Sequence, residues 1–186
     1  MMMSDLTSEH SLTASHPTLA DAICAKVGKR DIALWATALE RHFTLSPFSL
    51  LPEKLEKEHH VEISVAGLIL VFSHPHAVYS DTGDVARWFL KSVEFSFMSS
   101  DHTCWKASAP FGLTPKEETH QSIESKLGDD ATDIRKEDLR QSFYLDDGLV
   151  ACVMWHPSGK GIQSLTVVRL GSEMDYEPLN VELSLR

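Results

Sequence analysis

The chain has 186 residues, of which 42% are hydrophobic, enough to bury the core of one ordinary domain. Seventeen Lys and Arg against 27 Asp and Glu give a formal net charge of −10. This charge argues against a nucleic acid or an anionic membrane as partner, because both attract positive charge, and it favours a basic protein. Solubility alone is the alternative explanation of the charge.

The cysteines and the N-terminus indicate a compartment. Cys24, Cys104 and Cys152 lie far apart, so the sequence predicts neither a disulfide framework nor a structural zinc site. The first residues lack the basic and apolar regions of a signal peptide, and the longest apolar run, residues 65–72, is too short to span a bilayer. We therefore expect a cytoplasmic protein without a membrane anchor.

The first half of the chain is predicted to start with helices. Residues 1–17 are rich in Ser, Thr and His and are predicted to be a disordered tail, with a single α+β domain over 18–186. Thr18 is expected to cap a helix that ends at Gly28, and the apolar spacing over 31–43 predicts a second helix.

The apolar spacing then changes from helical to alternating. Residues 61–65 and 68–72, separated by a turn at Gly67, predict a hairpin, and the alternation over 88–98 predicts a third strand.

The second half is predicted to repeat this order. Thr114 is expected to cap a helix with Pro115 at its first position and Glu117 closing the capping box, and Gly128 ends it. Residues 129–140 are predicted to be a polar connection.

Strands are predicted over 142–145, 149–155 and 162–170, and "NVELSLR" at the C-terminus is a candidate edge strand. The predicted fold class is α+β, an antiparallel sheet of meanders with helices packed on one face. The segments "VEISVAGLILVFSHP" and "SFYLDDGLVACVMWHP" resemble each other, so the halves 18–105 and 106–186 are either two degenerate repeats or a chance convergence of two hairpins.

Histidines and a cysteine raise the possibility of metal chemistry. His74, His76, His102 and Cys104 form short pairs that can place nitrogen and sulfur ligands on one face of a strand. Solvated loop histidines are the alternative. Cys104 beside His102 has no group that would orient the base, so no nucleophilic site is indicated. We expect no enzyme activity, no metal and no cofactor.

Acidic clusters near aromatic residues are the candidate partner-binding site. Acids give electrostatic attraction to a basic protein, and aromatic rings give the contacts that hold it. The alternatives are that these carboxylates bond the local backbone and that the rings lie in the core. The candidate residues are Asp129, Asp130, Asp133, Tyr144, Asp146, Asp147 and Trp155.

Residues 109–170 resemble a known group of proteins. The order "FGLT" before a capped helix that ends in "KLGDD", then "DDGLVACVMW", a turn and "IQSLTVVRL", resembles immunity proteins of bacterial polymorphic toxin systems, such as contact-dependent inhibition or type VI secretion. The same order is similar to β-lactamase-inhibitor-like units and to a small outer-membrane assembly lipoprotein, which are exported.

The resemblance implies a non-enzymatic protein that neutralises one cognate toxin by stoichiometric masking. It transfers no binding residue to this sequence, so the site residues above rest on the sequence alone. A secretion chaperone, which would form a stable dimer, and a metal-dependent enzyme using the His and Cys residues are the alternative functions.

Overall fold

The computed structural model describes residues 17–29, 39, 60–73, 89–98, 103–128, 131–135, 139–145 and 148–169, with the backbone alone for 131–135. Residues 1–16 of the predicted tail over 1–17, the predicted C-terminal strand and nearly all of the predicted helix over 31–43 lie outside these residues. Leu39 is the described residue of that helix, and it is helical and buried.

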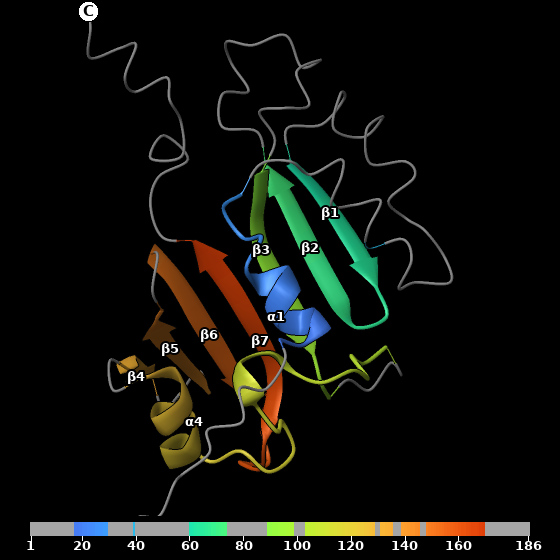
Figure 1. Cartoon of the computed structure of the whole chain (residues 1–186). Coiled ribbons are helices and arrows are strands. Elements are labelled where there is room, and N and C mark those ends of the chain that lie inside the picture. Colours follow the sequence, from blue (N-terminus) through green and yellow to red (C-terminus); the bar gives the residue numbers. More distant parts are fainter. Residues whose placement is uncertain are drawn as a thin grey trace, which may run out of the picture.

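An antiparallel sheet organises the described part of the chain, as the α+β prediction expected (Figure 1). Its seven strands lie in the order β1-β2-β3-β7-β6-β5-β4, so that β3 joins the strands of the first half to those of the second. The strands are β1 (His60–Val65), β2 (Leu68–Ser73), β3 (Phe89–Ser96), β4 (Ala131–Arg135), β5 (Arg140–Tyr144), β6 (Leu149–Trp155) and β7 (Ile162–Arg169).

The core lies between the sheet and two helices on the same face (Figure 1). On this face β3 and β7 pair Val93 with Val167 and Phe95 with Leu165, and all four side chains are fully buried. Alternation sends the intervening residues, such as Glu94, to the other face, where they are only partly buried.

Helix α1 (Leu19–Cys24) starts where the sequence predicts but ends early. Thr18 caps the helix as predicted and forms a capping box with Asp21, and Ile23 is fully buried. Gly28 donates its N–H to the Leu90 carbonyl of β3 at 2.7 Å, and Val27 pairs with Leu90. The chain therefore leaves the helix to extend along the sheet before the glycine.

Helix α4 (His120–Leu127) begins later than predicted. The amides of Glu117 and Glu118 both donate to the Thr114 carbonyl, which closes a single turn. Thr119 is then extended and caps the helix in a capping box with Ser122, so Thr114 is not the cap. The predicted end at Gly128 is confirmed.

The other elements are a short 3-10 turn and the strands. The turn η3 (Pro110–Gly112) lies in the segment 103–119, here called the strap, which connects the two halves of the sheet. The predicted hairpin over 61–72 and the strands over 89–96, 149–155 and 162–169 are confirmed. The prediction of a polar connection over 129–140 was wrong for residues 131–135, which form β4 and pair with β5. An edge strand forms backbone hydrogen bonds on one side only, so it needs no apolar pattern.

Candidate partner-binding surface

Tyr144 is the one predicted site residue whose side chain is described and exposed. It lies at the end of β5, opposite Val150 of β6, and 49% of its surface is accessible. It is also the exposed large hydrophobic residue among the described residues. A half-exposed ring that has already lost part of its water contact is suited to hold a partner.

Trp155 lies elsewhere and is buried. It ends β6 at the opposite end from Val150, and only 4% of its surface is accessible. Its Nε1 donates to Oε1 of Gln141 at 3.3 Å, and the His120 ring of α4 packs on it with 4.1 Å between ring centroids. The structure therefore separates the two predicted aromatic anchors, and Trp155 fastens α4 to the sheet.

The Gln141 side chain, fully buried, is the centre of this contact. Its NH₂ group donates to the Glu124 carboxylate at 3.4 Å, which fixes the orientation of the amide because a carboxylate only accepts. The amide oxygen then accepts from Trp155 and from Nδ1 of His120 at 3.0 Å. No sequence pattern indicated this group, because Gln141 reads as an ordinary polar residue at the start of a strand.

Described residues that adjoin four of the predicted acids in the sequence lie at the Tyr144 end of the sheet. Asp129, Asp130, Asp146 and Asp147 lie outside the described residues, and Asp133 lies in β4, where only the backbone is described. Their described neighbours can be placed, since Ala131 pairs with Phe143.

Leu149 pairs with Arg169 at this same end. The chain therefore enters β4, leaves β5, enters β6 and leaves β7 here. We call this the acidic end of the sheet, defined by Ala131, Tyr144, Leu149 and Arg169 and named for the acidic residues that adjoin these positions in the sequence. The sequence after Arg169 adds Glu173, Asp175 and Glu177.

Charge is divided unevenly along the chain. The residues with described side chains include nine Lys and Arg against six Asp and Glu, a net charge of +3. The rest of the 186 residues therefore carries 8 basic and 21 acidic side chains, a net charge of −13. The net negative charge of this protein therefore comes from the residues whose side chains are not described.

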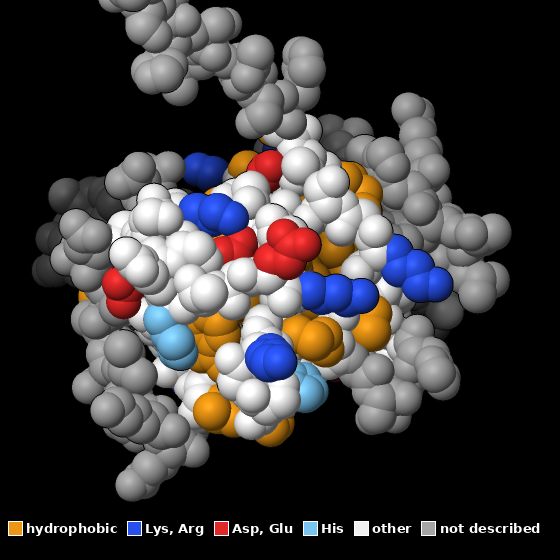
Figure 2. All heavy atoms as spheres, turned by 90° about the horizontal axis from the view of Figure 1, so that it is seen from below, with side chains coloured by type: hydrophobic (Ala, Val, Ile, Leu, Met, Phe, Trp, Pro, Cys, Tyr) orange, Lys and Arg blue, Asp and Glu red, His pale blue; other side chains and the backbone are white. Residues whose placement is uncertain are grey.

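The opposite end of the sheet has a different character. Figure 2 views the molecule from this side, where basic, acidic and histidine side chains surround exposed hydrophobic groups. The strap crosses here. A Cβ built on Gly67 would lie 2.1 Å from the Trp105 nitrogen, so the strap packs directly on the β1–β2 turn.

Two carboxylates, one partly buried and one buried, hold the strap in place. Asp21 accepts from the Phe111 N–H at 2.7 Å, which ties the cap of α1 to η3. Burial raises the pKa of Asp21, but the hydrogen bonds from Phe111 and Thr18 outweigh it, and the net pKa is below its ordinary value.

Glu118 is the second such group, with 2% of its side chain exposed. It accepts from the Thr114 N–H at 2.6 Å, from Lys126 Nζ at 2.6 Å and from the Ser122 hydroxyl. Burial raises the pKa of Glu118, and the bonds from Lys126, Ser122 and Thr114 lower it further than burial raises it. The spacing of four residues between Thr114 and Glu118 was the sequence signal for this contact, but the spacing of Thr114 and Glu117 fitted a capping box better.

The candidate metal ligands are not brought together by the described residues. His74, His76 and His102 lie outside them, and Cys104 is partly buried in the strap. In the part of the chain that is described, no three His, Cys, Asp or Glu side chains are grouped closely enough to hold a metal ion. None of the described helices has the length and apolarity needed to cross a membrane.

Comparisons with known proteins found no family model that matches this chain, and no significant match among curated proteins or solved structures.

Proposed function

We propose that this protein is a cytoplasmic immunity protein that binds one cognate toxin and masks its active or functional surface. The observation that carries the proposal is the acidic end of the sheet, where exposed Tyr144 lies beside the strand ends that lead to acidic segments. Acids accelerate encounter with a basic surface, and an aromatic ring slows dissociation. The resemblance of residues 109–170 to immunity proteins supplies the class of partner.

We also infer that residues 18–105 and 106–186 are two copies of a helix-plus-meander unit, as the resemblance to immunity proteins would lead us to expect. Each half has a helix before its strands, and Gly67 and Gly148, both with positive φ, immediately precede β2 and β6. Aligning the two halves across related sequences tests this. Coincident glycine and apolar positions support duplication, whereas a score no better than that of shuffled sequences rejects it.

Co-purification with the product of the neighbouring gene is the test of the proposed function. We expect a one-to-one complex, and we expect this protein to restore growth of cells that express that product. Absence of both the complex and the restored growth would contradict the proposal.

Charge-neutral variants locate the surface. Asp146→Asn combined with Asp147→Asn should slow association at low salt, and the difference should shrink as salt rises, because screening weakens long-range attraction. Tyr144→Ala should speed dissociation instead. Glu62→Gln is the matched control, since Glu62 is an exposed acid on β1 in the other half of the sheet.

The secretion chaperone is the second candidate, favoured only by the small size and acidity of the chain. It requires a stable dimer that holds an unfolded segment. A monomeric mass in solution, together with binding to a folded partner, distinguishes the immunity protein from the chaperone.

A further inference from the structure

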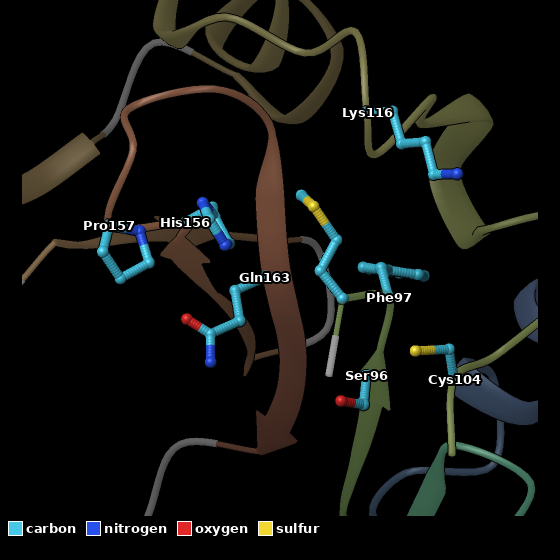
Figure 3. A pocket seen from close by; sticks show the side chains of 8 residues that line it. Ser96, Phe97, Cys104, Lys116, His156, Pro157 and Gln163 are labelled. Atoms are coloured by element: carbon cyan, nitrogen blue, oxygen red, sulfur yellow. The ribbon is translucent and has the colours of Figure 1, made fainter. Parts of the chain in front are cut away.

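A pocket of about 660 Å³ opens at the strap end of the sheet, away from the acidic end (Figure 3). Residues from the end of β3, the start of β7, the β6–β7 turn and the strap line it. In Figure 3 the Lys116 side chain points away from that of Gln163, so the polar groups of the pocket do not converge on one ligand. A different surface, on the face of the sheet opposite the helices, brings acidic, hydroxyl and aromatic side chains together.

The open face of the sheet is the face opposite the described helices α1 and α4, which both lie on the core side (Figure 1). Strand pairing sets four residues in one row across it, each opposite the next: Tyr144, Val150, Val168 and Ser92. Val150 is buried, and Val168 and Ser92 are partly exposed. Since neighbouring strands lie about 4.8 Å apart, this row spans about 14 Å. Tyr144 therefore belongs both to the acidic end and to the open face.

Small polar side chains form the next row of the open face. Strand pairing runs from Ser142 to Cys152, Thr166 and Glu94, and all four are only partly exposed. Covering short side chains such as Ser and Thr restricts few rotamers, and a Tyr ring supplies contact area at low entropic cost. The same combination of Tyr and Ser is common in antibody binding sites. The open face is therefore suited to bind another protein.

Glu94 is the acid in the middle of this face. Its carboxylate accepts from the Thr166 hydroxyl at 3.5 Å, whereas O–H···O bonds usually measure about 2.5–3.0 Å. The carboxylate therefore keeps the capacity to accept a stronger, charge-assisted bond from a Lys or Arg. The base that strand pairing places on the open face is Arg140 of β5, three strands from Glu94. At about 14 Å, beyond the screening length of physiological salt, Arg140 does not neutralise this carboxylate.

We propose that the toxin docks on the open face between Tyr144 and Glu94, with a toxin Lys or Arg bonded to Glu94 and apolar toxin groups against Tyr144 and Val168. This docking site rests on the proposed function and names the contact that holds the partner, whereas the acids at the acidic end act earlier, on encounter. A second copy of this chain fits less well, because it would oppose acids to acids.

Glu94→Gln tests the contact in the complex with the product of the neighbouring gene. We expect its dissociation rate to rise about tenfold, because a charge-assisted bond inside the interface is lost, with a smaller change in the association rate. Glu62→Gln is the matched control and should leave both rates unchanged, since Glu62 lies on β1, two strands beyond β3. Unfolding midpoints in urea establish that both variants are folded. A dissociation rate of Glu94→Gln equal to that of the unsubstituted protein overturns the proposal.

Methyl NMR of the protein labelled at Leu and Val supplies a measurement without substitutions. Val167 and Val168 are adjacent, but Val167 is fully buried in the core and Val168 lies on the open face. On addition of the unlabelled product of the neighbouring gene, the Val168 signals should shift or broaden much more than those of Val167. Shifts at Leu19 of α1 without shifts at Val168 would place the partner on the helices and overturn the proposal.

The two measurements separate this docking site from the proposed function. Absence of any complex contradicts the immunity function and the docking site together. A complex that forms one-to-one but leaves the Val168 signals unmoved and Glu94→Gln without effect overturns the docking site alone.

Discussion

Two glycines that each precede a strand permit a direct test of how the strap packs. Gly67 precedes β2 and Gly148 precedes β6, with φ of 79° and 72°. Alanine in this left-handed region costs about 1–2 kcal/mol whatever surrounds it. A Cβ on Gly148 meets no atom of the described residues within 4 Å, whereas on Gly67 it would lie 2.1 Å from the Trp105 nitrogen and 2.3 Å from the Cys104 carbonyl carbon.

The contacted atoms at Gly67 are backbone atoms of the strap, which cannot rotate away as a side chain does. Overpacking adds about 1–3 kcal/mol. We therefore expect Gly67→Ala to lower the free energy of unfolding by about 2–5 kcal/mol and Gly148→Ala by only about 1–2 kcal/mol.

Urea denaturation followed by circular dichroism measures both free energies. The midpoint of Gly67→Ala should fall well below that of Gly148→Ala, with similar slopes against urea concentration. Equal destabilisation by the two substitutions would refute the packing of the strap on the β1–β2 turn.

Three further predictions concern buried groups. The pKa of Glu118 in the folded protein is below its ordinary value, so its contribution to stability is complete above about pH 4.5 and is lost as pH falls through the folded pKa. Glu118→Gln should therefore lower the free energy of unfolding at pH 7 and reduce the stability that is lost on acidification, as urea denaturation at several pH values will measure. Trp155→Ala should lower stability by about 3–5 kcal/mol and Tyr144→Ala by less than about 1 kcal/mol, as thermal unfolding will measure; the reverse order would contradict their burial. Cys24 is buried and burial raises its pKa, so iodoacetamide should modify Cys104 well before it, and mass spectrometry of the digested protein reports the order.

Local patterns in the sequence predict the elements that depend on local chemistry. Alternation of apolar residues identifies β6 and β7, and Thr18 with Asp21 identifies the start of α1, because these signals lie within one element. The end of α1 was mispredicted because Gly28 bonds to Leu90, which is distant in sequence. A hydrogen bond between residues that are distant in sequence cannot be predicted from the pattern within one element.

The candidate site was only partly predictable for the same reason. Sequence proximity suggested that Tyr144 and Trp155 act together, but β6 is long enough to carry Trp155 to the other end of the sheet. The pocket was not predicted at all, because four separate segments form it and none of them has a recognisable motif. Edge strand β4 was missed because pairing on one side needs no apolar alternation.

Binding to the product of the neighbouring gene, measured by titration calorimetry with both proteins folded, tests the central proposal most directly. We expect one-to-one binding that weakens when Asp146→Asn and Asp147→Asn are combined and that is unchanged by Glu62→Gln. Heat changes no greater than those of dilution, together with failure of this protein to restore growth, would contradict the role of an immunity protein.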